Sequence, residues 1–294
     1  MTYPPQTAPL TAPGLWPQVA LPTDLGPDRL SERHRRMLAH TDRFITADGV
    51  PLALTRRRYS GAAGDQSERV ILVAPGLFTS RDCPEHQAFA EQLTAIADVV
   101  TVDVRGHGES GGRFSWGIQE PADMAALGAQ LRREYRQVGA VGFSFGGYHL
   151  GMAAATQRTF DAVAMVATPR CFSPLDRHFL LRGVRKSLLA ARRRRGYAGR
   201  FSLTPFRRDR KPALAIVGQI APTPLLLMHG TDDWLLGLHH ARELYARATD
   251  PKSLVLVPGG PHAEGMMVAH AAGLVPPLLE FLDRSLLRVE HQRG

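Results

Sequence analysis

The chain has 294 residues, of which 44% are hydrophobic, and a formal net charge of +9 at pH 7. This length and apolar content fit a globular protein with one large domain and a full hydrophobic core. Only three of its 36 basic residues are lysine. No zinc-finger spacing, aromatic RNA-binding motif or heptad repeat accompanies the charge, so we expect no nucleic-acid partner.

The sequence also indicates the compartment. No apolar run reaches the length of a membrane span, and the N-terminus lacks the basic-then-apolar pattern of a signal peptide. We therefore expect a cytoplasmic protein. Its two cysteines, Cys83 and Cys171, are too few for a disulfide framework and lack metal-site spacing, so we predict that both are packing residues.

The N-terminal part is predicted to lie outside the main alternation of strands and helices. Residues 1–30 are rich in Pro, Thr and Ala, which is typical of an extended arm. A short basic helix is expected over 28–39. Two strand-like runs within 40–59 then flank Asp48-Gly49, the sequence of a hairpin turn.

From residue 70 onward, short apolar runs alternate with helical patterns. The runs predict strands at 70–74, 99–103, 138–141, 162–167, 224–229 and 253–257. Helices are predicted at 83–97, 121–135, after 147 and at 276–287. Buried strands alternating with helices predict an α/β fold with a mostly parallel central sheet flanked by helices.

One segment interrupts this alternation. Residues 170–221 form a connection of roughly fifty residues, far longer than usual between such elements. We predict that this segment is an inserted cap, and that 31–169 and 222–294 form the core.

The first chemical motif is Gly142-Phe143-Ser144-Phe145-Gly146, which stands between the run 138–141 and the helical segment after it. A sharp turn from strand to helix crowds the residue at its pivot, and small residues two positions before and after relieve the crowding. This pattern therefore predicts an exposed serine hydroxyl at the end of a buried strand.

A serine hydroxyl needs a base to take its proton and a further group to orient that base. Candidates follow the last two predicted strands: Asp232 and Asp233 in His-Gly-Thr-Asp-Asp, and His262 in Pro-Gly-Gly-Pro-His. The order Ser, acid, His is one of the known chain orders of a catalytic triad. Both aspartates stay open as the acid on this argument.

Together with Pro75-Gly76-Leu77-Phe78 and the stretch 103–110, these motifs resemble the serine hydrolases of the α/β-hydrolase fold, the esterases and lipases among them. The resemblance covers about 43–287. It implies Ser144 as nucleophile, His262 as general base and Asp233, three residues after Gly230, as acid. Asp232 is the rival, with capping of the following helix as its structural alternative.

The resemblance also implies an oxyanion hole. Its backbone N–H donors are predicted to come from Phe145, next to the nucleophile, and from Leu77 in the loop after the first apolar strand. The family often has His-Gly in this loop where the chain has Pro75-Gly76. The stretch 103–110 contains His107 and Glu109, but its glycines favour a structural turn. Trp116, Glu120 and Asp123 are likewise predicted to be structural and to hold a loop and start a helix.

The predicted cap contains an amphipathic pattern over 177–195, with leucines on one face and arginines on the other. We favour the interpretation that these arginines are exposed to water over the interpretation that they bind an anionic membrane or ligand. Four residues are predicted to contact the substrate: Phe78, Phe143, Leu180 and Leu188. An apolar lining suits a small molecule with an apolar acyl part.

These observations predict a serine hydrolase that cleaves carboxylic esters or thioesters through an acyl-enzyme intermediate. An amidase, a carbon–carbon bond hydrolase and an acylglycerol lipase are alternatives on the same fold. A catalytically silent binding protein is disfavoured by the intact Ser144, Asp233 and His262. Nothing in the sequence predicts a metal or organic cofactor.

Overall fold

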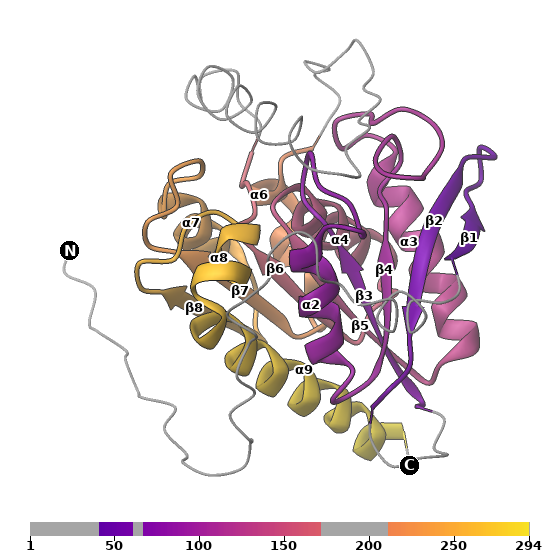
Figure 1. Cartoon of the computed structure of the whole chain (residues 1–294). Helices are drawn as coiled ribbons and strands as arrows, with labels where there is room; N and C mark the ends of the chain where they lie inside the picture. The colour runs from indigo at the N-terminus through magenta and orange to yellow at the C-terminus, as the bar shows by residue number, and fades with distance from the viewer. Residues whose placement is uncertain (1–40, 61–66, 172–210, 294) are drawn as a thin grey trace. The chain divides into compact units, whose positions relative to one another are not determined.

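The computed structural model describes residues 41–60, 67–171 and 211–293 (Figure 1). Several predictions lie outside these residues: the extended arm, the basic helix at 28–39, and Leu180 and Leu188 of the cap. The sheet and the three predicted triad residues lie within them.

The centre of the fold is an eight-stranded sheet with the strand order β1-β2-β4-β3-β5-β6-β7-β8. The strands β1 and β2 pair antiparallel with each other, β2 pairs antiparallel with β4, and every pairing from β4 to β8 is parallel. The strands are β1 (Thr41–Ile45), β2 (Pro51–Arg57), β3 (Arg69–Ala74), β4 (Asp98–Val102), β5 (Gln137–Phe143), β6 (Ala162–Val166), β7 (Leu225–Gly230) and β8 (Lys252–Val257). The predicted α/β fold with a mostly parallel sheet is confirmed.

The helices cover both faces of this sheet (Figure 1). They are α2 (Pro84–Leu93), α3 (Glu120–Glu134), α4 (Phe145–Gln157), α6 (Ala213–Ile216), α7 (His239–Arg247), α8 (Glu264–Ala269) and α9 (Ala271–Arg293), with a 3₁₀ turn η2 (Val217–Ile220). Side chains of α3, α4 and α7 belong to the core on one face, whereas those of α2, α8 and α9 belong to the core on the other.

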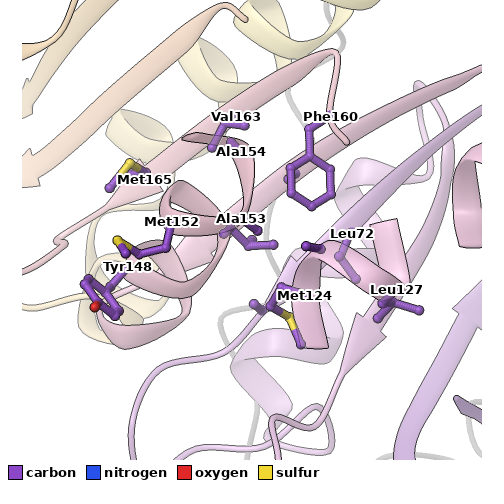
Figure 2. Close-up of a cluster of buried hydrophobic side chains, with 14 of the residues drawn as sticks. Leu72, Met124, Leu127, Tyr148, Met152, Ala153, Ala154, Phe160, Val163 and Met165 are labelled. Atoms are coloured by element: carbon purple, nitrogen blue, oxygen red, sulfur yellow. The ribbon is translucent and has the colours of Figure 1, made fainter. Parts of the chain in front are cut away.

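Strand β3 shows why the core has two parts. Successive side chains of a strand point to opposite faces. Accordingly Val70, Leu72 and Ala74 join the cluster with α3 and α4, while Ile71 and Val73 join the cluster with α2 and α9. Figure 2 shows part of the first cluster, in which Leu72 lies among side chains of α3 and α4. A run that is apolar at every position is therefore buried on both sides.

The predicted hairpin is present in the structure. The strands β1 and β2 form the hairpin around Asp48-Gly49, and Gly49 has the positive φ of 79° that this turn requires.

The last helix begins at Ala271, before the predicted start at Pro276. Both Pro276 and Pro277 lie inside it. Leucines at four-residue spacing hold the helix against the sheet: Leu274, Leu278, Leu282 and Leu286 are fully buried.

The described end of the predicted cap belongs to the core layer. Buried side chains of α6 and η2 pack in the same cluster as α4. Two hydrogen bonds tie down the ends of the segment: Leu214 N–H donates to Arg170 O at 3.0 Å, and the Tyr148 hydroxyl donates to Lys211 O at 2.7 Å. The cap over the site stays a prediction. Across the described ranges, no helix has both the length and the hydropathy needed to cross a membrane.

Candidate active site

Ser144 stands at the turn from β5 into α4. Its backbone has φ 52° and ψ −116°, a strained combination for a residue with a side chain. A Cβ atom on Gly146 would lie 2.1 Å from the carbonyl oxygen of Ala74, and one on Gly142 would lie 2.4 Å from the backbone of Gly146. The two glycines are therefore required by close backbone packing, as the motif predicts.

His262 bonds to both of the other predicted triad residues. Its Nε2 lies 3.1 Å from Ser144 Oγ, and its Nδ1 lies 2.7 Å from Asp233 Oδ2. With the proton on Nδ1, the imidazole donates to the carboxylate and leaves Nε2 as acceptor for the serine hydroxyl. The structure thus brings together three residues whose positions span 144–262 in the sequence.

The sheet topology explains why Asp233 and His262 lie close together. Strands β7 and β8 are parallel neighbours, with Gly230 paired to Val257, so the loops that follow them lie side by side. Backbone hydrogen bonds join the loops: Thr231 N–H donates to Val257 O and Asp232 N–H donates to Gly260 O, both at 3.0 Å. These bonds fix the acid loop against the histidine loop.

The two aspartates differ in environment. The Asp233 side chain is almost fully buried, and its Oδ1 accepts the backbone N–H groups of Leu235 and Leu236 at 2.9 and 2.8 Å. Asp232 is exposed and accepts only the neighbouring hydroxyl of Thr231 among the described contacts. Helix α7 begins at His239, so Asp232 does not cap it, and that alternative is wrong.

The charge of Asp233 follows from its contacts. Burial alone raises the pKa of a carboxyl group, but the hydrogen bond and charge interaction with His262 and the backbone N–H of Leu236 outweigh it. The pKa of Asp233 is therefore held below its ordinary value. The carboxylate stays ionised at neutral pH and can stabilise a positive charge on His262.

His229 lies behind the acid. Its Nε2 is 2.9 Å from Leu236 O and 3.3 Å from Asp233 Oδ2. Burial lowers the pKa of His229, so the ring is neutral and donates its Nε2–H to the carbonyl oxygen. The histidine therefore anchors the acid loop.

The loop 75–79 lies beside the nucleophile. A Cβ atom on Gly76 would be 3.3 Å from the Ser144 Cβ. The side chains of Leu77 and Phe145 pack in one cluster with Val104, Phe114 and Trp116. The two predicted oxyanion donors thus belong to segments that flank Ser144, and their role remains a prediction.

The predicted substrate contacts Phe143 and Phe78 lie in different parts of the structure. Phe143 is fully buried and packs edge-on against Phe89 and His86, at ring-centroid distances of 5.0 and 5.6 Å. Its side chain points into the core because adjacent residues of a strand face opposite sides, which corrects its assignment to the substrate pocket. Phe78 is 9% exposed in the loop 75–79. Leu180 and Leu188 lie outside the described residues.

The stretch 103–110 is structural, as expected. The Asp103 carboxylate accepts the backbone N–H groups of Arg81 and Glu109 and forms an ion pair with the Arg81 guanidinium. The Ser110 hydroxyl donates to Asp103 O and accepts Ala53 N–H, which fastens the turn to β2. These bonds hold the turn in place.

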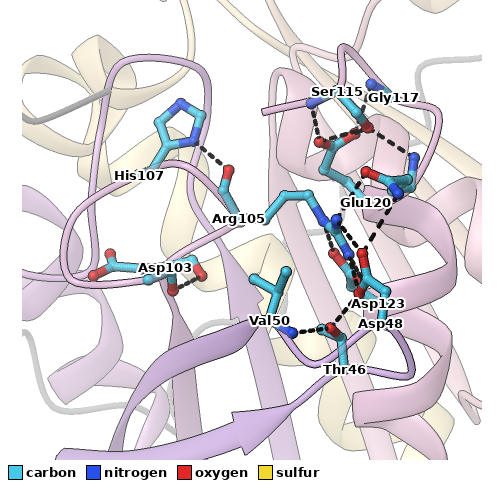
Figure 3. A network of polar contacts seen from close by, with 12 residues as sticks. Thr46, Asp48, Val50, Asp103, Arg105, His107, Ser115, Gly117, Glu120 and Asp123 are labelled. Atoms are coloured by element: carbon cyan, nitrogen blue, oxygen red, sulfur yellow. Dashed lines mark hydrogen bonds and ion pairs between the residues drawn. The ribbon is translucent and has the colours of Figure 1, made fainter. Parts of the chain in front are cut away.

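Figure 3 shows the neighbouring polar network. Arg105 forms ion pairs with Asp48 of the hairpin turn and with Asp123 of α3. Glu120 accepts the backbone N–H groups of Ser115 and Gly117 and begins α3. Glu120 and Asp123 therefore hold a loop and a helix start, as the sequence predicts. Of the residues placed in the structure, no group of three or more His, Cys, Asp or Glu is arranged to hold a metal ion.

Glu264 and His86 lie beside the site, but neither belongs to a sequence motif. Glu264 Oε1 lies 3.2 Å from Gly76 N, and 3.2 Å from His86 Nε2 on α2. These contacts join positions 178 and 188 residues apart. Only the place of Glu264, two residues after His262, points toward the site.

Comparison with known proteins agrees with this architecture. Residues 69–182 match a family model described as alpha/beta hydrolase fold. The uncharacterized protein YfhR of Escherichia coli K12 is 32% identical over 70 residues, which are 24% of this chain and 25% of YfhR. The match thus spans about a quarter of the length of this curated relative.

Two solved structures cover most of the chain. The alpha/beta hydrolase GrgF from Penicillium sp. sh18 has a TM-score of 0.71 at 19% identity, covering 84% of this chain and 99% of that one. The Pyrococcus furiosus esterase Pf2001 has a TM-score of 0.68 at 20% identity, covering 84% and 91%. At such identities the likeness establishes the fold.

Proposed function

This chain has the α/β-hydrolase fold, and from that premise we propose that it is a serine hydrolase of carboxylic esters, with Ser144, His262 and Asp233 as its triad. The observation that carries the proposal is the hydrogen-bonded chain from Ser144 Oγ through His262 to Asp233, at 3.1 and 2.7 Å. The esterase among the similar structures gives independent support for this class of reaction.

The proposed reaction begins at Ser144. Its Oγ attacks the ester carbonyl while His262 Nε2 takes the hydroxyl proton. The carbonyl π electrons move to oxygen, and the resulting oxyanion accepts hydrogen bonds from the backbone N–H groups of Leu77 and Phe145. Asp233 keeps the imidazole in the required tautomer and stabilises its charge.

The intermediate then collapses in two stages. The carbonyl forms again, the bond to the alcohol oxygen breaks, and His262 gives its proton to the leaving alcohol. Water attacks the acyl-enzyme with His262 again as base, and cleavage of the bond to Ser144 releases the acid and restores the hydroxyl. A thioester would follow the same steps with a thiol as leaving group.

The surroundings of Ser144 suit a developing negative charge. Helix α4 begins at Phe145, so its N-terminal N–H groups and the positive end of its dipole lie next to the nucleophile. The apolar cluster that includes Phe145 and Phe114 has two partly exposed members, Leu77 and Trp116, which form the wall available to a substrate. We propose that this wall receives an apolar part of the ester, with Leu180 and Leu188 of the cap as further contacts.

Turnover of a substrate panel tests the proposal. The panel contains p-nitrophenyl esters of increasing acyl length, the matching thioesters and anilides, each with wild type, Ser144→Ala and His262→Ala. We expect esters to be cleaved fastest and each substitution to lower turnover by about 10⁴-fold or more, because nucleophile and base act as a unit.

Ser67→Ala is the matched control, since Ser67 precedes β3 at the opposite end of the parallel strands from Ser144. It should leave turnover unchanged. Ester turnover that survives Ser144→Ala would contradict the proposal, and anilides cleaved faster than esters would replace it with an amidase.

A further inference from the structure

Glu264 connects the histidine loop to the loop 75–79. It is the first residue of α8, and it follows His262 by two positions. Its Oε1 lies 3.2 Å from Gly76 N and 3.1 Å from Thr79 Oγ1. Both donors belong to the loop that carries Leu77, so one carboxylate oxygen holds this loop at two points.

The third donor to the same oxygen is His86. Its Nε2 lies 3.2 Å from Glu264 Oε1, and its ring is fully buried on α2. His86 Nδ1 has no hydrogen-bond partner among the described residues. The carboxylate can only accept, so Nε2 carries the proton and donates.

These contacts make Glu264 an acceptor of converging donors from two separate segments: Gly76 N–H, His86 Nε2–H and the single proton of the Thr79 hydroxyl, which Glu264 Oε1 shares with Gly76 O at 3.0 Å. Burial raises the pKa of a carboxyl group, but the hydrogen bond and charge of His86, with the charge of His262, outweigh it and lower the pKa of Glu264 to about 2. An ionised acceptor makes stronger hydrogen bonds than a neutral one. The carboxylate is therefore suited to hold the loop firmly.

The position of the loop matters because of its distance to Ser144. A Cβ atom on Gly76 would lie 2.9 Å from Glu264 Oε1 and 3.3 Å from the Ser144 Cβ. Gly76 thus fits between the carboxylate and the nucleophile with no room for a side chain. A shift of this loop would move the next backbone N–H, that of Leu77, relative to Ser144.

We propose that Glu264 is a positioning residue of the oxyanion hole, which fixes the loop 75–79 so that Leu77 N–H is held where the oxyanion develops. The proposal rests on the proposed serine hydrolase function. Glu264 touches none of the reacting groups in this account and acts through the loop.

A negative charge this close to the oxyanion site also has an opposing effect, since like charges repel. The hydrogen-bond donors of Gly76, Thr79 and His86 spread the charge of the carboxylate, and the repulsion is weakened accordingly. The substitutions Glu264→Gln and Glu264→Ala distinguish the positioning of the loop from the charge repulsion. Glutamine keeps an acceptor oxygen for the loop without the charge, whereas alanine removes both.

The test measures kcat and KM for p-nitrophenyl acetate and the inhibition constant of phenylboronic acid, which forms a tetrahedral adduct on an active-site serine. Glu264→Ala should lower kcat on the order of 10²-fold, the usual effect of losing one oxyanion donor, with KM within about threefold of wild type. Binding of the boronic acid should weaken in parallel with kcat/KM, because both depend on the same donors.

The variants Glu264→Gln and Thr79→Val retain part of the tether, and each should stay within about tenfold of wild-type kcat. Ser67→Ala is again the control, because Ser67 lies at the opposite end of the parallel strands from Ser144, and it should match wild type. Should Glu264→Ala fail to fold, Thr79→Val must still lower kcat and boronic-acid affinity together at unchanged KM.

Two results separate the proposals. A wild type without Ser144-dependent turnover overturns the proposed function and this inference with it. An active wild type whose kcat and boronic-acid affinity are unchanged in Glu264→Ala, or changed only through KM, overturns the inference alone.

Discussion

Gly230 allows a test of how the acid and histidine loops are held together. It ends β7, three residues before Asp233. A Cβ atom here would lie 2.0 Å from Gly260 O and 2.7 Å from Pro261 O. Ordinary contact begins at 3.4 Å, so Gly230→Ala requires the loops to separate by 3.4 − 2.0, or about 1.4 Å. Both obstacles are backbone atoms, and no side-chain rotation relieves them.

The separation acts on the triad. The Asp233–His262 hydrogen bond is 2.7 Å long, and a shift of 1.4 Å would take it to about 4 Å, beyond hydrogen-bond range. A misplacement near 1 Å can lower a catalytic rate by about 10²-fold. We expect Gly230→Ala to reduce kcat/KM for p-nitrophenyl acetate by about 10²-fold. Overpacking should also lower the free energy of unfolding by about 1–3 kcal/mol.

Activity and chemical denaturation together check this expectation. Gly139→Ala in β5 is the matched control, because its Cβ would meet only side chains at 3.4 Å or more and should preserve activity. If Gly230→Ala acts through Asp233, the double variant with Asp233→Asn should be no less active than Asp233→Asn alone. A folded Gly230→Ala with wild-type kcat/KM, or additive losses in the double variant, would show that Gly230 does not position Asp233 against His262.

Three further expectations concern single residues. Asp233→Asn should lower kcat far more than Asp232→Asn in steady-state assays, and the reverse order would give the acid role to Asp232. Burial lowers the pKa of His107 from 6.5 to about 4, so the unfolded chain binds a proton at higher pH than the folded one. Stability should therefore fall by about 3 kcal/mol as the pH drops from about 6.5 to about 4. Urea denaturation should show a smaller loss in His107→Gln than in wild type, since other groups with lowered pKa values, such as His229, still contribute; equal losses would contradict it. Leu188→Ala should shift the preferred acyl length of the ester panel while leaving acetate turnover nearly intact, since each buried methylene adds at most about 0.8 kcal/mol; an unchanged preference would remove Leu188 from the pocket.

Much of the fold follows from local patterns. The fully apolar run at 70–74 predicts a strand buried on both faces, and β3 is one. Gly142 and Gly146 predict the tight turn at Ser144. Gly142 is required by the backbone of the turn itself, whereas Gly146 is required by the close approach of Ala74 at the end of β3. The chain order of Ser144, Asp233 and His262 predicts that their side chains lie close together, because the loops that follow parallel strands lie at one edge of the sheet.

The remaining features depend on contacts that local patterns do not encode. The pairing of Glu264 with His86 joins α8 to α2 across 178 residues, and neither residue belongs to a motif. The early start of α9 is set by Leu274 and the leucines after it, whose burial against the sheet prevails over the two prolines. Phe143 stands beside Ser144 in the sequence, but the alternation of strand side chains turns it into the core.

The most direct test of the central claim is labelling with a fluorophosphonate, which reacts with an activated serine hydroxyl and forms a stable phosphonyl adduct with loss of fluoride. Mass spectrometry of the labelled protein and its peptides locates the adduct. We expect one adduct, on Ser144, which is absent in Ser144→Ala and formed far more slowly in His262→Ala. An adduct on another residue, or equal labelling of wild type and Ser144→Ala, would contradict it.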